Sequence, residues 1–364
     1  MGIARILVFH IGSIGDTVIS IPSLMAIRRY YGDKSVITLL HETRQKVRTN
    51  PEDVLTKGLV DKYIAYPFSS NIFVSMFYAM VLCFKLRIRR FQVIVYLLPG
   101  ERSSKQIQRD KNYFRFCGIP DLIGFHDLSK EILNSSEPNG HPALIQHEAF
   151  RRLERLRLNG IDTSIEERIT LPLIELPLQE IEKVVTWLNL NRQKPNRPLV
   201  AICPGTKQKA NSWPVNRFVE IGRELICRNT YELLIIGGPS EAIIGDDMVD
   251  IWGEGLNAAG LFTVLGSTAL LSNCLFMIGL DTGTTHLAAA VGTPCIGLYG
   301  ERENPGQWDP IGNRHIVIRH RVSCAGCRLS ECNIPGHPCM TGITVGQVKK
   351  AIQQMEQDLK IANL

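Results

Sequence analysis

The chain has 364 residues, of which 45% are hydrophobic and 21% are charged, and its formal net charge is +6. This length suits two α/β domains better than one, and the composition excludes wholesale disorder. The mild positive charge fits an anionic partner such as a nucleotide diphosphate or an acidic lipid surface, and the absence of a long Lys/Arg run gives no reason to expect nucleic acid.

The sequence contains neither a recognisable secretory signal nor a membrane span. The first apolar run, Ile6 to Ile11, is short and leads into a Gly-rich turn without a cleavage site. The longest apolar run, Ile72 to Phe84, is shorter than the ~20 residues that cross a bilayer. We therefore expect a cytoplasmic protein whose ten cysteines are thiols or metal ligands rather than a disulfide framework.

In the first half of the chain, short apolar runs alternate with helical stretches, which is typical of a parallel sheet covered by helices. Strands are expected at Arg5–Ile11, Ser35–Leu40, Lys62–Tyr66 and Phe91–Leu98. Helices are expected at Asp16–Tyr31, Ile72–Arg90 and around His147–Leu158.

The same pattern restarts after a proline-containing segment, Leu171–Leu178, which favours extended chain. A helix is expected at Gln179–Leu190, followed by four strands that each end in a Gly-containing turn: Leu199–Cys203, Leu233–Gly238, Leu275–Leu280 and Pro294–Tyr299. Such turns form ligand sites at the carboxyl edge of an open α/β sheet. The predicted organisation is a first Rossmann-like domain, a linker region, a second Rossmann-like domain and a C-terminal helix, over residues 1–172, 173–198, 199–345 and 346–364.

The first motif, Gly12-Ser13-Ile14-Gly15-Asp16, directly follows the first strand and opens a helix. Gly12 and Gly15 allow a tight turn, and the N–H groups of the helix start point at the edge of the sheet. Asp16 is then either a residue that caps the helix or a carboxylate that faces a ligand. The motif is not a dinucleotide fingerprint, because G-x-G-x-x-G is absent.

The second motif, Asp281-Thr282-Gly283-Thr284-Thr285-His286, joins a buried-type strand to a helix. The backbone N–H groups of Gly283, Thr284 and Thr285 are expected to be available in the first turn, where threonine hydroxyls and His286 would complete a diphosphate site. The alternative is a capped helix with a partly buried histidine.

Two further loops follow predicted strands. Cys203 to Pro214 is basic, and either Lys207 or Lys209 is placed to neutralise a phosphate; a solvated basic loop is the other interpretation. Gly237-Gly238-Pro239-Ser240-Glu241 places a carboxylate, Glu241, where nucleotide-binding folds hold ribose hydroxyls, although the same letters also read as an ordinary helix start.

Two features lie outside these loops. The cysteines Cys324, Cys327, Cys332 and Cys339 fall within sixteen positions and are either ligands of a tetrahedral zinc ion or reduced or paired thiols. The stretch Ile72–Phe84 is followed by Lys85, Arg87, Arg89 and Arg90, so it is either a core-facing helix with a basic end or a helix that lies on the inner membrane surface.

Taken in order, Gly-Ser-Ile-Gly-Asp, Pro-Gly…Trp-Pro, Gly-Gly-Pro-Ser-Glu, Asp-Thr-Gly-Thr-Thr-His and Trp308-Asp309-Pro310 resemble glycosyltransferase family 9, the ADP-heptose:lipopolysaccharide heptosyltransferases and their relatives. The resemblance runs from about Ile6 to about Val348. It implies a GT-B fold, in which two Rossmann-like domains face each other across a cleft, with the first on the acceptor side and the second on the donor side. It also implies an inverting mechanism without a cofactor or required metal.

Carried over residue by residue, the resemblance places the catalytic base at Asp16 and the diphosphate-binding block at Asp281, Thr282, Gly283 and His286. It places the ribose contact at Glu241. One departure concerns the donor: relatives often have Lys two residues before the Trp-Pro pair, and this chain has Asn211 there. Lys207 or Lys209 would then supply the missing charge, or the donor would be held differently.

The sequence thus predicts an inverting glycosyltransferase that moves heptose or a related sugar from a nucleotide-diphosphate donor to a lipopolysaccharide or other glycan or lipid-linked acceptor. Such transfer needs one base for the acceptor hydroxyl and fixed N–H groups and cations for the departing diphosphate. The alternatives are a sugar-nucleotide epimerase of the same architecture and a donor-binding protein without transfer.

Overall fold

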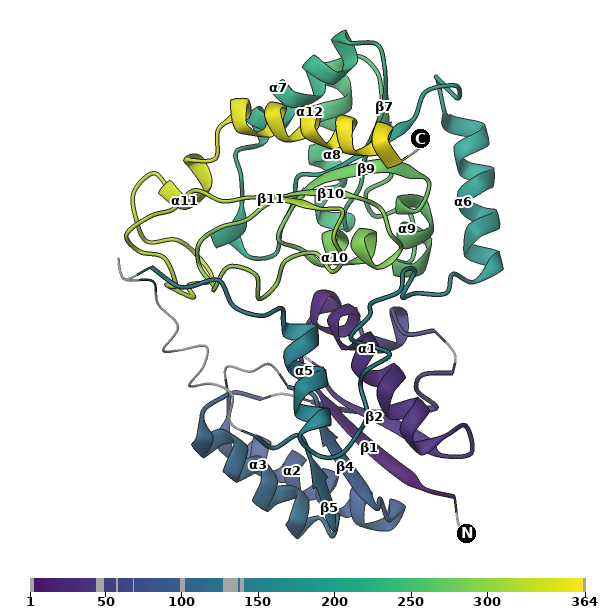
Figure 1. Ribbon diagram of the computed structural model, residues 1–364, viewed down its shortest axis with the longest axis vertical. Helices are drawn as coiled ribbons and strands as arrows, with labels where there is room; N and C mark the ends of the chain where they lie inside the picture. The colour runs from purple at the N-terminus through teal and green to yellow at the C-terminus, as the bar shows by residue number, and fades with distance from the viewer. Residues whose placement is uncertain are drawn as a thin grey trace. The chain divides into compact units, whose positions relative to one another are not determined.

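The computed structural model describes residues 3–43, 49–56, 58–67, 69–98, 102–126, 137 and 141–362. The chain forms two compact units, and each is built on its own parallel sheet (Figure 1). The first unit comprises Met1–Ser135 and Ile145–Leu173, and the second comprises Ser136–Leu144 and Ile174–Leu364. Among the helices of the described residues, none has both the length and the apolar character needed to cross a membrane.

The first unit has a five-stranded sheet in the order β3-β2-β1-β4-β5. Its strands are β1 (Arg5–His10), β2 (Val36–Thr43), β3 (Lys62–Pro67), β4 (Val93–Tyr96) and β5 (Asp121–Ile123). Its helices are α1 (Ile14–Tyr31), α2 (Ile72–Arg89), α3 (Ser104–Phe116) and α5 (Glu148–Arg157). The four strands predicted here are present; α3 and β5 were not predicted, and β4 is shorter than the apolar run that indicated it.

The strands of this sheet read as apolar runs because both of its faces are covered. Helices α2 and α3 pack on one face, where Leu86 and Phe114 meet Leu7, Phe9 and Ile94 of the strands. Helix α5 packs against α1. The first unit therefore has the expected helix-covered parallel sheet.

The second unit has a six-stranded sheet in the order β11-β10-β9-β6-β7-β8. Its strands are β6 (Leu199–Cys203), β7 (Glu232–Ile235), β8 (Leu256–Asn257), β9 (Cys274–Leu280), β10 (Cys295–Leu298) and β11 (Ile316–Ile318). Its helices are α6 (Leu178–Asn191), α7 (Val215–Cys227), α8 (Ala242–Trp252), α9 (Val264–Leu271), α10 (Gly283–Ala290), α11 (Pro338–Thr341) and α12 (Val345–Ala362).

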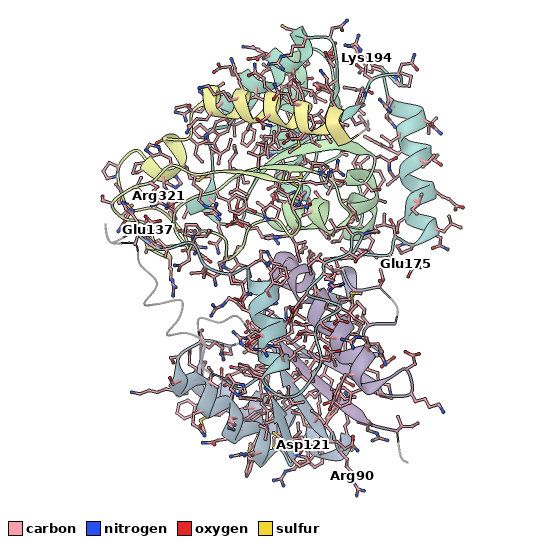
Figure 2. The ribbon with its side chains drawn as sticks, viewed as in Figure 1. Arg90, Asp121, Glu137, Glu175, Lys194 and Arg321 are labelled. Atoms are coloured by element: carbon pink, nitrogen blue, oxygen red, sulfur yellow. The ribbon has the colours of Figure 1, made fainter. Side chains whose placement is uncertain are left out.

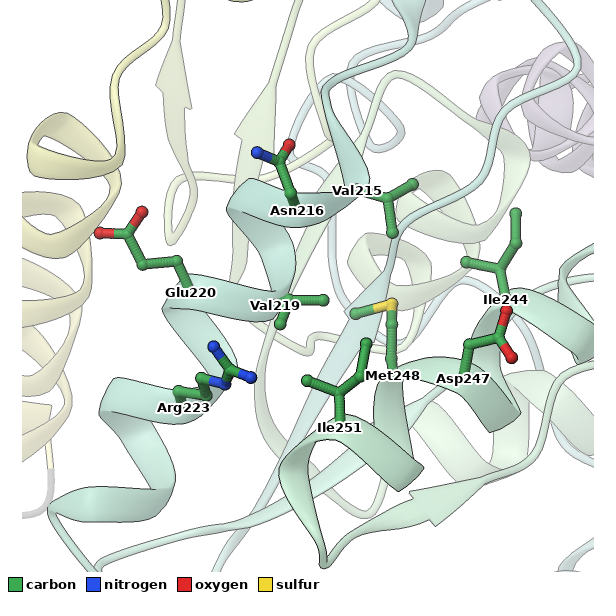
Figure 3. Close-up of a pocket in the computed structure, with 9 residues that line it drawn as sticks. All are labelled: Val215, Asn216, Val219, Glu220, Arg223, Ile244, Asp247, Met248 and Ile251. Atoms are coloured by element: carbon green, nitrogen blue, oxygen red, sulfur yellow. The ribbon is translucent and has the colours of Figure 1, made fainter.

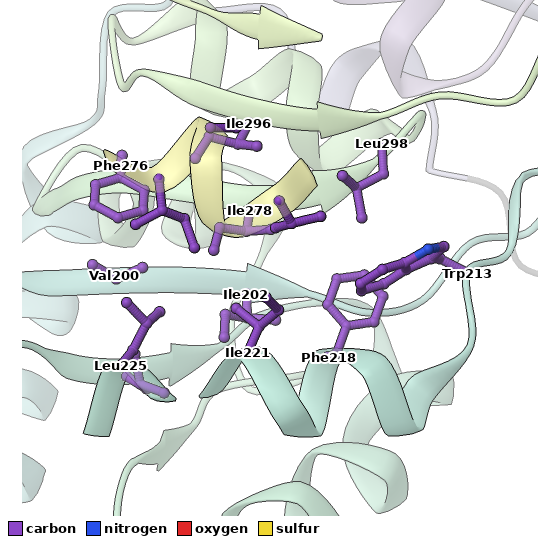
Figure 4. Close-up of a cluster of buried hydrophobic side chains, with 14 of the residues drawn as sticks. Val200, Ile202, Trp213, Phe218, Ile221, Leu225, Phe276, Ile278, Ile296 and Leu298 are labelled. Carbon is purple, nitrogen blue, oxygen red and sulfur yellow. The ribbon is translucent and has the colours of Figure 1, made fainter. Parts of the chain in front are cut away.

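A large apolar core holds α7 and α12 against one face of the second sheet (Figure 4). Helices α9 and α10 lie on the opposite face (Figure 1). Phe218 of α7 packs edge-on against Trp213, with ring centroids 4.8 Å apart. The indole N–H of Trp213 donates to the carbonyl of Ile343 at 2.9 Å, so the Trp-Pro motif also ties the chain before α12 to the core.

Each sheet reverses its strand order once, and the reversals decide where a ligand is expected. In the first sheet the order changes direction between β1 and β4, and in the second between β6 and β9. Open α/β sheets bind ligands outside the carboxyl ends of the strands at such a reversal. Asp16 lies in the first turn of α1, directly after β1, and the segments after β6 and β9 contain Asn211 and Asp281.

A short segment that precedes α5 in the sequence, Ser136–Leu144, belongs to the second unit. The Arg321 guanidinium donates to the Glu137 carboxylate, with Nη2 and Oε1 2.8 Å apart, and Figure 2 shows the two side chains together. The side-chain amide of Asn304 donates to the carbonyl of Ala143 at 3.4 Å. These contacts hold Glu137 and Ala143 against the segments that follow β10 and β11.

Candidate functional site

The start of α10 is the first part of the candidate site on the second unit. β9 ends at Leu280, Thr282 has extended backbone at the N-cap, and α10 begins at Gly283. The hydroxyl of Thr285 donates to the carbonyl of Leu280 at 2.6 Å, and its N–H donates to the carbonyl of Thr282 at 3.1 Å. The expectation that this N–H is available was therefore wrong, and the N–H groups of Gly283 and Thr284 remain as the candidate donors to a ligand.

A buried polar cluster adjoins the helix start. The Asn211 amide donates to the Asp281 carboxylate, with Nδ2 and Oδ2 3.0 Å apart. Asn211 is 2% exposed and Tyr299 is 3% exposed. Among the described residues, the amide oxygen of Asn211 and the hydroxyl of Tyr299 have no hydrogen-bond partner. These two atoms can therefore hydrogen-bond to a polar ligand that reaches the start of α10.

Electrostatics at Asp281 oppose its ionisation. Burial raises the pKa of Asp281 to about 6, although Arg302 and Arg319 act in the opposite direction. Burial also raises the pKa of Tyr299 well above its ordinary value. Arg319 lies over the Tyr299 ring at 5.1 Å and donates to the Asp309 carboxylate. The two guanidinium groups near Asp281 are the cations that the sequence interpretation missed, because nothing in the spacing of Arg302 and Arg319 connects them to Asp281.

The loops after β6 and β7 bring Glu241 to the same edge. A Cβ added to Gly205 would lie 2.1 Å from Cγ of Glu241, so only glycine allows this approach. The Glu241 carboxylate accepts hydrogen bonds from the Gly238 N–H and the Ser240 hydroxyl, both at 2.7 Å. The predicted ribose residue therefore faces the end of β6, with its orientation fixed by its own turn.

The two lysines that were predicted to neutralise a phosphate, Lys207 and Lys209, are exposed, whereas Asn211 is buried. Lys209 pairs with Glu331, with Nζ and Oε1 3.1 Å apart. Exposed lysines at a loop can move to a ligand, but neither is held next to Asp281 by a contact in the structure.

The four C-terminal cysteines come together. Cys324, Cys327, Cys332 and Cys339 line one cavity of about 50 Å³, and all are reduced. Within the part of the chain that the structure describes, no three His, Cys, Asp or Glu side chains are arranged to hold a metal ion. The cysteine loop contacts the β6 loop through the His337 ring, whose Nε2 lies 2.9 Å from the carbonyl oxygen of Ala210.

Asp16 lies in the first turn of α1 on the first unit. Its Oδ2 accepts hydrogen bonds from the N–H of Ser13 at 2.8 Å and from the hydroxyl of Ser13 at 3.0 Å. The capping interpretation of Asp16 is therefore part of the structure. The Asp16 side chain remains 18% exposed. A Cβ added to Gly12 would lie 2.3 Å from Cβ of Asp16, so glycine at position 12 is what lets the Asp16 side chain occupy this turn.

A buried ionic cluster supports Asp16 from α5. The Arg152 guanidinium is fully buried, donates to the backbone carbonyl of Asp16 at 2.9 Å and lies 3.5 Å from Oδ1 of its carboxylate. Arg152 also lies 3.4 Å from Oε1 of buried Glu148. Burial and Arg152 lower the pKa of His10 to about 3, so the imidazole near this cluster is neutral. Sequence reasoning missed Arg152, since 136 residues separate it from Asp16.

A hollow on the second unit lies away from these loops. It has a volume of about 740 Å³ and opens between α7 and α8, where Val219, Met248 and Ile251 form an apolar floor beside Glu220 and Arg223 (Figure 3). None of the predicted site residues lines it. The predicted site residues of the second unit lie instead in the loops and turns that follow β6, β7 and β9.

The family model and the curated relatives that match this chain are all described as heptosyltransferases. The family model described as glycosyltransferase family 9 (heptosyltransferase) matches residues 170–337. Lipooligosaccharide heptosyltransferase 2 of Haemophilus influenzae is 27% identical over 149 residues, which cover 39% of this chain and 42% of that protein. Lipopolysaccharide heptosyltransferase 2 of Escherichia coli is 27% identical over 274 residues, which cover 71% and 74%. The match to the first relative thus spans less than half of its length.

Solved structures resemble the whole chain. The glycosyltransferase family 9 structure from Veillonella parvula has a TM-score of 0.69 at 18% identity and covers 98% of this chain and 97% of its own. The Escherichia coli ADP-heptose LPS heptosyltransferase II has a TM-score of 0.62 at 19% identity and covers 99% and 100%. At these identities the likeness establishes the fold, and the predicted GT-B class is confirmed.

Proposed function

Since the chain is a heptosyltransferase-like protein of glycosyltransferase family 9, we propose that it transfers heptose from ADP-heptose to a lipopolysaccharide-type acceptor with inversion at the anomeric carbon. The names of the relatives supply the sugar and the acceptor, and the solved heptosyltransferase II supplies the nucleotide. One observation of the structure carries the proposal: buried Asn211 and Tyr299 present unpartnered polar atoms beside the helix start of the Asp-Thr-Gly-Thr-Thr-His motif.

On the donor side, the diphosphate binds at the first turn of α10. The N–H groups of Gly283 and Thr284 and the positive end of the helix dipole favour an anion there. The guanidinium groups of Arg302 and Arg319, whose fields reach Asp281, add positive charge, and Glu241 binds the ribose hydroxyls. Negative charge on the diphosphate increases as its bond to the anomeric carbon breaks. Fixed donors and charges of this kind therefore stabilise the departing diphosphate more strongly than the bound donor.

On the acceptor side, Asp16 is the general base. The acceptor oxygen attacks the anomeric carbon as the bond from that carbon to the diphosphate oxygen breaks, and the hydroxyl proton passes to the carboxylate of Asp16. The N–H and hydroxyl of Ser13 hold Oδ2, and Arg152 lies beside Oδ1, so the carboxylate has one orientation. Correct placement is what a weak base needs, because the hydroxyl becomes acidic only as the anomeric bond breaks.

The transfer proposed here requires no metal, since N–H groups and guanidinium groups compensate the charge of the diphosphate. Turnover in the presence of EDTA should equal turnover in its absence. A loss that added Mg²⁺ or Zn²⁺ restores would show that a metal takes part.

The deciding experiment measures ADP release from ADP-heptose with and without a lipopolysaccharide-type acceptor. A transferase releases ADP at a rate that depends on the acceptor, and NMR of the product shows the inverted anomer. Release without acceptor, or conversion of the donor sugar to an epimer, would contradict transfer. Binding without any release would leave a donor-binding protein. The relatives named above are all transferases, which favours the first outcome over the epimerase.

A further inference from the structure

Helix α2 of the first unit presents an apolar face outward. Large apolar side chains recur every three or four residues along it, and each is at least 37% exposed: Phe73, Met76, Phe77, Met80, Val81, Phe84 and Ile88. The opposite side of the helix, with Leu82, Cys83 and Leu86, packs into the core. The helix is thus apolar on both sides, whereas a helix on a water-exposed surface normally turns a polar face outward. A contiguous exposed apolar face of this kind marks an interaction surface.

The positive charge of the chain is concentrated at the same place. Residues 72–116, which include α2 and α3, contain nine Lys and Arg and two Asp and Glu, a net charge of +7. The whole chain has a net charge of +6, so all remaining residues together have a net charge of −1. One of the two acids, Asp110, is buried and accepts hydrogen bonds from the Tyr96 hydroxyl and the Arg102 guanidinium, both at 2.8 Å. Asp110 also pairs with the exposed Arg109, with Oδ1 and Nη2 2.8 Å apart, so it offsets part of this charge, and the net charge of +7 already includes that contribution.

Helices α2 and α3 form one continuous surface. The hydroxyl of Tyr113 on α3 donates to the carbonyl of Ala79 on α2 at 2.8 Å. The Arg87 guanidinium donates to the carbonyl of Phe116 at 2.6 Å and lies 4.9 Å from the centre of its ring. Phe116 is 66% exposed, so α3 adds an aromatic side chain beside the apolar face of α2. Basic residues flank that face on both helices: Lys85, Arg89, Lys105, Arg109, Lys111 and Arg115.

We propose that the α2–α3 surface docks on an anionic bilayer, with α2 in the plane of the interface, its phenylalanines and methionines among the upper acyl chains, and the flanking lysines and arginines at the headgroups. A helix with this pairing of apolar and basic side chains is suited to such a surface. A second copy of the chain is a poorer occupant, because two surfaces of like charge would repel. This inference rests on the proposed function in one respect: the bilayer is where an acceptor with a lipid anchor would be met.

The test is co-sedimentation of the full-length protein with vesicles of phosphatidylcholine, alone or mixed with phosphatidylglycerol. Binding should require the anionic lipid and weaken as salt is added. A charge variant replaces four exposed basic residues of the surface with Gln: Lys85, Arg89, Lys105 and Arg115. An apolar variant replaces three exposed side chains of α2 with Gln: Phe77, Met80 and Phe84. Each variant should bind the anionic vesicles at least about tenfold more weakly than the unmodified protein.

Matched controls change the same number of charges and apolar side chains on the second unit. The charge control replaces Arg223, Arg314, Lys350 and Lys360 with Gln, and the apolar control replaces Leu190, Ile243 and Leu261 with Gln. Both controls should bind vesicles as the unmodified protein does. Equal binding by the surface variants and their controls would overturn the proposal. So would a dimer, seen by analytical ultracentrifugation, that dissociates in the apolar variant.

Turnover separates this inference from the proposed function. With a water-soluble, delipidated acceptor, the charge and apolar variants should react at the rate of the unmodified protein, whereas with acceptor in vesicles they should be slower. No turnover by any form would contradict the proposed function and would leave the vesicle result intact. Equal rates of all forms on acceptor in vesicles would contradict the role of the surface in reaching the acceptor.

Discussion

Asp16 has two candidate roles, helix cap and general base, and two substitutions separate them. Asp16→Asn keeps one side-chain oxygen, which can still accept the hydrogen bond that the Ser13 N–H makes at 2.8 Å. Asp16→Ala removes the acceptor for that bond and for the bond from the Ser13 hydroxyl at 3.0 Å. At ~0.5–1.5 kcal/mol for each hydrogen bond, the Ala variant should lose about 1–3 kcal/mol of unfolding free energy and the Asn variant less than about 1 kcal/mol.

Turnover should not follow stability. Both substitutions remove the proton acceptor, so both should reduce turnover by ~100- to 10,000-fold, the usual contribution of a general base. Neither changes the second unit, so donor affinity measured by calorimetry should stay within a few-fold. Thermal denaturation gives the stability of each variant, and ADP release under saturating donor and acceptor gives the rate.

The two variants give opposite patterns if Asp16 is only a cap. The Asn variant would then work at close to the unmodified rate, and the Ala variant would lose activity only to the extent that it unfolds. That result would refute the assignment of Asp16 as base.

Three further predictions concern the two units. His286→Ala in the first turn of α10 should weaken donor binding by ~1–3 kcal/mol, the range for a lost charged hydrogen bond, and unchanged affinity in calorimetry would contradict the diphosphate assignment. Glu148→Gln removes the buried carboxylate that lies within 4 Å of Arg151, Arg152 and Arg155, and it should destabilise the first unit by about 3–5 kcal/mol in thermal unfolding; Glu154→Gln, at the exposed side of the same helix, should have little effect. The pKa of Asp281 is raised to about 6, so the protonated form stabilises the fold below about pH 4 and that contribution is lost as pH rises through 6. Asp281→Asn should therefore raise the unfolding free energy relative to the unmodified protein at pH 8 by up to about 3 kcal/mol and by less at pH 5; a difference independent of pH would show that burial does not raise this pKa.

Most strands of the fold could be predicted from the sequence, because a strand covered on both faces appears as an apolar run, and here such runs end in Gly-containing turns. β6 and β9 were predicted almost to the residue for this reason. β4 ends two residues early, since the N–H of Leu97 still bonds to Phe9 while the carbonyl of Leu98 accepts from the Arg155 side chain and not from a neighbouring strand. A side chain that replaces a strand partner leaves no trace in the hydrophobic pattern.

Residues of the candidate site could be predicted only where they lie close together in the sequence. The turn before α10 and the turn before α1 each contain their own motif. The contacts that complete them do not: Arg152 reaches Asp16 across 136 residues, and Asn211 reaches Asp281 across 70. Spacing within one sequence cannot show such pairs, because they depend on which loops the strand order brings together.

Asn211 bears on the electrostatics of the candidate donor site through its hydrogen bond to Asp281. A Lys at this position, which the resemblance to family 9 led us to expect, would put an ammonium group beside the aspartate of the α10 turn, and a cation there lowers the pKa of a carboxylate. Asn211 donates a neutral hydrogen bond of 3.0 Å to Asp281 instead, and burial then raises the pKa of Asp281 to about 6. The carboxyl group is thereby close to neutral under mildly acidic conditions, and a neutral carboxyl group can donate a hydrogen bond to a diphosphate where a carboxylate would repel it. Below about pH 6 the protonated Asp281 brings no negative charge to the site, and Arg302 and Arg319 act on the same carboxyl group. The departure from the family pattern is therefore compatible with a diphosphate donor.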